Sequence, residues 1–454
     1  MRENPRAPEP ETPEPEIPDP EIPAPAPSAP EATPPNPLDE LDHSNRLDRL
    51  DRLDRLDRLE QLPGLDWQVF AERYWDRRPV LFKAVAPAPF DAHEVFETAV
   101  AAAHRGGPFA VPPYAEFAVG GEPQAEPADF LPQPRDGSFA GYHQRLVRQL
   151  SGEPYSLSLG AFHAFHHPLW ARERDFYARL WARVGQPTPS AFTTLVHGTY
   201  EQPLTEALPG QRLATFLFTL SGRQRMRFGA AGQDTSFTVE AGPGDLLYWP
   251  SHHSPVSEPY AGWASTGVRV SVVREGRRAD AELYDLLHDV TPETLLAPDP
   301  DPAGPCPPGE ESLLVPDAET GADPGEALPA PLERALAHFR TVGARGPLAE
   351  RVARQSLRQW TAGGFRPVPP PAPRGRFGDD DVVRATERVL WTEAAGRRLF
   401  SACGHVAATE LPAEDLAAVL RFLNSGRPLS VHELAPLARG LLADLMAFRA
   451  LERL

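Results

Sequence analysis

The stretch Phe216-Leu-Phe-Thr-Leu-Ser-Gly-Arg-Gln-Arg-Met-Arg-Phe228, followed by Gly244-Asp-Leu-Leu-Tyr-Trp-Pro-Ser-His-His-Ser-Pro-Val256, decides the fold of this chain. Both segments place aromatic and aliphatic residues between Gly and Pro, which is typical of short β-strands. Runs of the same kind extend over residues 192–273. Short strands punctuated by turn residues over such a length predict an all-β barrel.

Composition excludes several classes of protein. The chain has 454 residues and a net charge of -18, which argues against binding through nucleic-acid phosphates. It has no run of 18 or more apolar residues, so no membrane span is expected. Residues 1–30 lack the apolar core of a secretory signal. Cys306 and Cys403 form no metal or disulfide pattern. We therefore expect a cytoplasmic protein that does not bind nucleic acid.

Shifts in composition divide the chain into four parts. Residues 1–64 begin with a Pro/Glu-rich tail, expected to be disordered, and end in a Leu-Asp-Arg repeat expected to form a spacer helix. The barrel domain is expected at 65–290, opening with a helix that Asp66 caps. A linker rich in Pro, Asp and Gly follows at 291–331. A C-terminal domain, mainly helical, is expected at 332–454.

The C-terminal domain has its own pattern of helices and short strands. The expected helices lie at 331–342, 348–360, 412–424, 430–437 and 441–451. The expected strands lie at 389–392 and 405–409. Helices combined with small strands in this order are compatible with a winged helix. Because the chain is acidic, a role in protein contact, such as homodimerisation, is expected instead of DNA binding.

Several segments in a fixed order resemble the JmjC-type and cupin-like oxygenases, which use Fe(II) and 2-oxoglutarate. The entry segment Tyr74-Trp-Asp-Arg-Arg-Pro-Val-Leu81, the turn Ser221-Gly-Arg-Gln-Arg225 and the strand Pro243-Gly-Asp-Leu-Leu-Tyr-Trp-Pro250 carry this resemblance. It implies an α+β fold, with a double-stranded β-helix (a jelly-roll barrel) flanked by helices. The tail more broadly resembles that of bacterial ribosomal oxygenases.

The resemblance also implies where an iron site and a co-substrate site should lie. Counting from Gly222 and Pro250 places the family's two histidines, its carboxylate and its lysine at Pro209, Pro255, Gln211 and Gln224. Proline has no donor atom for a metal, and neutral glutamine cannot supply the charge of Asp or Lys. The sequence thus predicts that no cofactor is bound at the usual positions.

Two functional hypotheses follow. In the first, the protein is a catalytically degenerate barrel that binds a peptide or a partner protein. In the second, it is an active Fe(II)- and 2-oxoglutarate-dependent hydroxylase of a peptide or protein side chain, with a relocated metal site at His197, Glu201 and His253. The cluster of His163, His166 and His167 is a further candidate for metal binding, although histidines on apolar segments more often serve the core.

Overall fold

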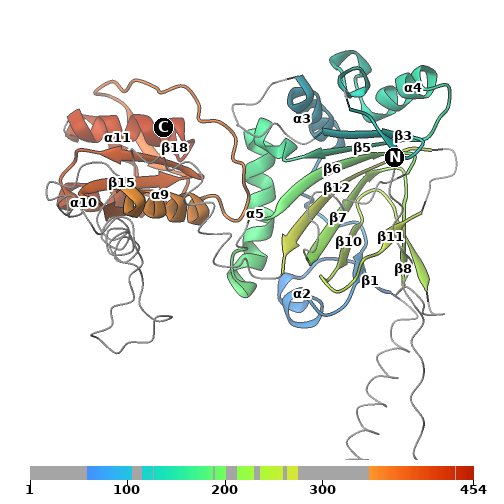
Figure 1. Cartoon of the computed structure of the whole chain (residues 1–454). Coiled ribbons are helices and arrows are strands. Elements are labelled where there is room, and N and C mark those ends of the chain that lie inside the picture. The colour runs from blue at the N-terminus through green and yellow to red at the C-terminus, as the bar shows by residue number, and fades with distance from the viewer. Residues whose placement is uncertain are drawn as a thin grey trace, which may run out of the picture. The chain divides into compact units, whose positions relative to one another are not determined.

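The computed structural model describes residues 59–104, 115–125, 127–187, 190–200, 212–229, 236–258, 263–274, 347–434 and 436–454. The chain has an α+β fold, as expected, and its largest element is a nine-stranded sheet (Figure 1). All neighbouring strands of this sheet are antiparallel except β1 and β2, which are parallel. In spatial order the strands are β1 (Glu60–Leu62), β2 (Val80–Phe82), β10 (Leu246–Trp249), β7 (Leu213–Ser221), β12 (Ser265–Val273), β6 (Phe192–Gly198), β5 (Tyr155–Gly160), β3 (Ala115–Val119) and β4 (Glu122–Pro123).

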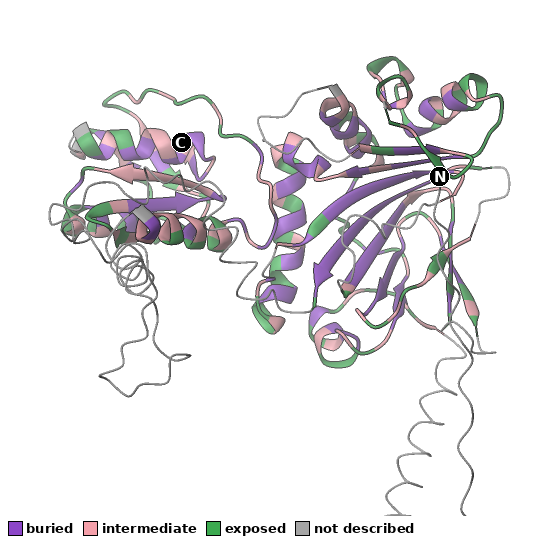
Figure 2. Ribbon diagram, viewed as in Figure 1, coloured by how far each residue is buried: buried purple, intermediate pink, exposed green. Residues whose placement is uncertain are grey.

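One face of the nine-stranded sheet, here called the helix-covered face, packs against four helices. These are α2 (Trp67–Arg73), α3 (Ala92–His104), α4 (Phe139–Gln149) and α5 (His167–Val184). Asp66 caps α2 as predicted, since its side chain accepts from the backbone N–H groups of Gln68 and Val69. The ring of Phe216 in β7 lies 5.5 Å from that of Phe70 in α2. Figure 2 shows that the strands under these helices are buried along most of their length.

The opposite face, here called the inner face, shares a second core with a three-stranded sheet. That sheet has the order β11 (Val256–Ser257), β8 (Gln224–Phe228) and β9 (Phe237–Ala241). The segments 216–228 and 244–256 supply residues of β7, β8, β10 and β11, so they contribute to both sheets. We call the shared core the inner cluster; its buried residues are Leu81, Val196, Leu217, Met226, Phe228, Val239, Ala241, Leu247 and Trp249.

The C-terminal unit contains two further three-stranded sheets. One has the order β14 (Leu390–Ala394), β15 (Arg397–Ala402) and β16 (His405–Thr409), and the other β17 (Leu429–Ser430), β13 (Val382–Ala385) and β18 (Leu451–Arg453). The helices are α9 (Pro347–Thr361), α10 (Ala413–Leu423) and α11 (Pro436–Ala447).

Most predictions for the described residues of this unit agree with the structure, but two helices do not, and the helix expected at 331–342 lies outside the described residues. The helices expected at 348–360 and 412–424 correspond to α9 and α10, and the strands expected at 389–392 and 405–409 correspond to β14 and β16. The helix expected at 430–437 is instead β17 followed by a short 3-10 turn, Val431–Glu433. The helix expected at 441–451 begins earlier, as α11, and ends at Ala447; only Leu451 of the expected range belongs to β18.

Contacts after α9 join the C-terminal unit to α5 and β6. Trp170 in α5 donates its indole N–H to the carbonyl of Phe365, at 3.3 Å. Phe365 also forms an isolated parallel bridge with Ala191, which precedes β6. Arg174 in α5 forms an ion pair with Glu387. The winged-helix prediction and the domain boundaries remain predictions, although β1 already pairs with β2 within the stretch expected to be a spacer.

Candidate functional site

The inner cluster occupies the space between the two sheets, where an oxygenase-like barrel would hold its reacting groups. Its members are aliphatic, aromatic or Met side chains, which offer no hard oxygen or nitrogen ligand. Arg269 on β12 also lies at this face, with its guanidinium 5.8 Å from the ring centre of Trp249. Among the described residues, no group of three or more His, Cys, Asp or Glu side chains could hold a metal ion.

Gln224, at the expected co-substrate position, lies inside this space. Its side chain is 1% exposed, and the alternating burial of β8 points it to the inner face. The Nε2 atom lies only 2.3 Å from where a Cβ on Gly267 would be, so a glycine is needed opposite it. The Oε1 atom has no hydrogen-bond partner within the described part of the chain. A neutral amide packed in this way cannot pair with a carboxylate as a lysine would.

His197 lies on the other side of the same sheet. Its strand neighbour Val196 belongs to the inner cluster, and successive strand residues point to opposite faces, so His197 is on the helix-covered face. Its ring stacks on Phe139 of α4, with centroids 5.2 Å apart. Burial, and then the charge of His143, lower the pKa of His197 to about 3. The imidazole is therefore neutral at physiological pH.

Both ring nitrogens of His197 are already used in a row of hydrogen bonds. Its Nδ1 lies 2.8 Å from Thr266 Oγ1, and its Nε2 lies 3.1 Å from the hydroxyl of Tyr155. The row continues at one end from Tyr155 to His143 Nδ1 at 2.8 Å, and at the other from Ser221 Oγ, which donates to Thr266 Oγ1 at 2.8 Å. We call these five side chains the polar row. A metal at His197 would have to displace one of these partners.

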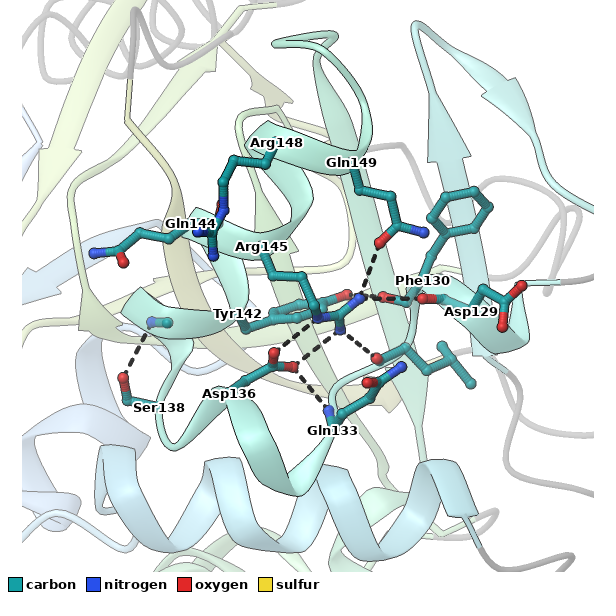
Figure 3. A network of polar contacts seen from close by, with 12 residues as sticks. Asp129, Phe130, Gln133, Asp136, Ser138, Tyr142, Gln144, Arg145, Arg148 and Gln149 are labelled. Atoms are coloured by element: carbon teal, nitrogen blue, oxygen red, sulfur yellow. Dashed lines mark hydrogen bonds and ion pairs between the residues drawn. The ribbon is translucent and has the colours of Figure 1, made fainter.

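Arg145 of α4 is the centre of a network of polar contacts (Figure 3). Arg145 binds both carboxylate oxygens of Asp136, from Nε at 2.7 Å and from Nη2 at 2.9 Å. Its remaining N–H groups reach the carbonyls of Asp129 and Leu131 and the amide of Gln149, at 3.1, 2.7 and 3.1 Å. Burial acts to raise the pKa of Asp136, but the hydrogen bonds from Arg145 outweigh it, so that the pKa is lowered. The helix that buries His197 is thus fixed by a fully used guanidinium.

His253 lies on the side of the inner cluster, so the structure does not bring it to His197. Its ring is 6.2 Å from the ring of Phe228, a member of that cluster. Burial, and then its neighbour His252, lower the pKa of His253 to about 4. Pro255, the expected distal ligand position, is half-buried just before β11. Glu201, Pro209 and Gln211 fall outside the residues that the structure describes.

The three histidines at 163–167 point to separate partners instead of a common metal. His163 Nδ1 lies 2.8 Å from Glu173, and both side chains are fully buried. Glu173 also accepts from Thr193 Oγ1 at 2.6 Å. His166 lies 3.2 Å from Glu94, and burial lowers the pKa of His167 to about 4, with help from nearby arginines.

Of the polar row, sequence reasoning singled out only His197 as a site residue. Tyr155 and Thr266 flank His197 in space but are 42 and 69 residues from it in the chain. A signal was available, since polar residues that interrupt apolar strands near their ends often pair across a sheet. That signal does not indicate which strands are neighbours.

Comparison with known proteins gives structural neighbours only. No protein-family model and no curated protein matches the chain. The structure is similar to the ribosomal oxygenase YcfD from Escherichia coli, with 15% identity over 87% of this chain and 99% of that chain and a TM-score of 0.45. YcfD in complex with cobalt and 2-oxoglutarate matches at 17% identity, over 87% and 99% of the two chains, with a TM-score of 0.44. These neighbours are oxygenases, the class that the sequence resembles. TM-scores below 0.5 give no basis for transferring an activity or a site.

No helix in the described part of the chain is long and apolar enough to cross a membrane.

Proposed function

We propose that this protein is a JmjC- or cupin-like barrel without oxygenase activity, which serves to bind a peptide or a partner protein. The observation that carries the proposal is the side-chain chemistry of the described residues: the inner face carries an apolar cluster, and no described group of three or more His, Cys, Asp or Glu side chains could hold a metal ion. Gln224 supports it, because the co-substrate position holds a packed neutral amide. The net charge of -18 favours a protein over a nucleic acid as partner.

The residues that the structure describes do not fit an iron site. His197 and His253 lie on opposite faces of the nine-stranded sheet, and the ring nitrogens of His197 are occupied by Thr266 and Tyr155. Metal ligation requires imidazole nitrogens within about 2.0–2.1 Å of one point.

Metal uptake by the purified full-length protein tests the proposal. The protein is incubated anaerobically with Fe(II), or with Mn(II) as a spectroscopic substitute, together with 2-oxoglutarate. Bound metal is measured by mass spectrometry and Mn(II) resonance, and succinate release by chromatography. We expect no stoichiometric metal and no succinate above a protein-free control. One equivalent of bound metal that is lost in both His197→Gln and His253→Gln would instead establish the relocated-site hydroxylase.

A peptide array probed with the same protein tests the binding role. We expect a set of related peptides to bind without added metal or 2-oxoglutarate. Binding that depends on either small molecule, or no binding at all, would contradict the proposed role.

A further inference from the structure

The segment between α9 and β13 contains a run of prolines, Pro369-Pro-Pro-Ala-Pro373, followed by Arg374-Gly-Arg376. Proline fixes φ at about −65°, and a residue that precedes proline is restricted to extended conformations. Both restrictions favour the polyproline II helix, which has three residues per turn and no internal hydrogen bonds. We call residues 369–376 the proline strap.

Burial along the proline strap repeats every three residues. Pro369 is buried, and Ala372 and Gly375 are half-buried. The exposed residues lie between and after these three; they are Pro370, Pro371, Pro373, Arg374 and Arg376. A repeat of three is that of the polyproline II helix. One line of side chains along the strap therefore lies against the protein, and the others face solvent.

Hydrogen bonds to backbone atoms hold the strap on the C-terminal unit. The carbonyl of Pro369 accepts from Nε2 of His405 at 3.0 Å, and the carbonyl of Pro370 accepts from Arg449 at 2.8 Å. The backbone N–H of Ala372 donates to the last carbonyl of α11 at 2.8 Å. These bonds order the backbone while the outward proline rings stay exposed. A segment ordered in advance loses little conformational entropy when it binds a partner.

Arginine side chains continue the exposed surface beyond the prolines. In a helix with three residues per turn, Pro370, Pro373 and Arg376 lie on one line, with steps of about 9 Å. The side chain of Arg374, on the adjacent line, is 71% exposed although it forms an ion pair with Asp444. The strap thus presents two proline rings in line, followed one turn later by a guanidinium group.

We propose that the proline strap is a recognition segment for a partner protein whose groove is lined by aromatic side chains and has carboxylates at one end. Aromatic grooves accept the proline rings of a polyproline II helix, and the helix needs no ordering on binding. The carboxylates pair with Arg376, about one turn beyond Pro373. The strap acts here as the ligand, so this site is separate from the peptide-binding role proposed for the barrel.

Binding of the full-length protein to purified domains that recognise polyproline II tests this proposal. The panel consists of SH3 and WW domains, each shown beforehand to bind a reference proline-rich peptide, with acidic or with neutral residues at the rim of the groove. Fluorescence anisotropy of each labelled domain is measured as the protein is added. We expect domains with an acidic rim to bind, and domains with a neutral rim to bind about tenfold more weakly.

Variants of the full-length protein locate the contact. Pro373→Ala and Arg376→Glu should each weaken binding about tenfold. Pro428→Ala, which alters an exposed proline of the same unit outside the strap, should leave binding unchanged. Thermal unfolding that is the same in all variants confirms that the C-terminal unit remains folded.

Three outcomes would overturn the proposal. One is the absence of binding to every domain of the panel at concentrations that saturate the reference peptide. Another is binding that Pro373→Ala or Arg376→Glu leaves unchanged, since the contact would then lie elsewhere. The third concerns a synthetic peptide of residues 366–377, which should compete more weakly than the intact protein because it must be ordered on binding. Stronger competition by the peptide would show that the anchored strap does not fit such a groove.

Discussion

Replacing His197 with glutamine removes a titrating group from the core but retains hydrogen-bonding capacity. An amide can accept from Thr266 and donate to Tyr155, the two partners of the imidazole. In the native protein the pKa of His197 is lowered to about 3, whereas an unfolded histidine titrates near 6.5. The unfolded chain therefore binds the proton first as the pH falls. This histidine stabilises the fold fully above about pH 6.5, and its contribution is lost progressively down to about pH 3.

The size of the effect follows from the two pKa values. As the pH falls from about 8 to about 5, a histidine with these two pKa values lowers the free energy of unfolding of the protein by about 2 kcal/mol. This corresponds to roughly 1.36 kcal/mol for each pH unit below 6.5. The side chain is fully enclosed, so solvent does not screen this term. Urea unfolding followed by tryptophan fluorescence at both pH values measures it. The His197→Gln variant should lose about 2 kcal/mol less than the unaltered protein over this range.

A control separates titration from packing. Phe139→Leu removes the ring that stacks on His197, so it should lower stability at both pH values while the pH dependence stays as in the unaltered protein. Other buried histidines, such as His253, titrate in all three proteins and cancel in the comparison. Equal pH dependence in the unaltered protein and His197→Gln would refute the assignment of a buried, neutral imidazole.

Two further substitutions test the packing on either side of the sheet. Arg145→Met leaves the buried carboxylate of Asp136 without its cation and should cost about 3–5 kcal/mol in urea unfolding; adding Asp136→Asn should recover part of this loss, and purely additive effects would contradict the pairing. Gly267→Ala places a Cβ 2.3 Å from Gln224 Nε2 and 2.9 Å from the carbonyl oxygen of Phe218. It should lower thermal stability by about 1–3 kcal/mol, whereas Gly440→Ala, with nothing within 4 Å, should not.

Local signals in the sequence predicted much of the fold. Asp66 caps α2 because its carboxylate reaches two free N–H groups of the first turn, an interaction that needs no tertiary context. Amphipathic spacing likewise located α9 and α10. The helix expected at 430–437 failed because Val382 pairs with Ser430, so that sheet pairing overrides the local preference for helix.

The candidate site was only partly predictable. Counting from Gly222 located Gln224, and the structure shows this residue buried on the inner face. The same counting could not decide which face His197 occupies. Alternation defines two faces of a strand, but only the position of α4 shows which one covers this histidine. Its partner Thr266 is brought beside it by β12, so no local pattern indicates their contact.

The polar row has a consequence for the protons that it carries. Ser221 donates to Thr266, which leaves the hydroxyl hydrogen of Thr266 available to donate in turn to Nδ1 of His197. The neutral imidazole then carries its proton on Nε2 and donates to Tyr155, whose hydroxyl donates to Nδ1 of His143. In this arrangement both histidines are the same tautomer, and the bond dipoles along four neighbouring strands align in one direction.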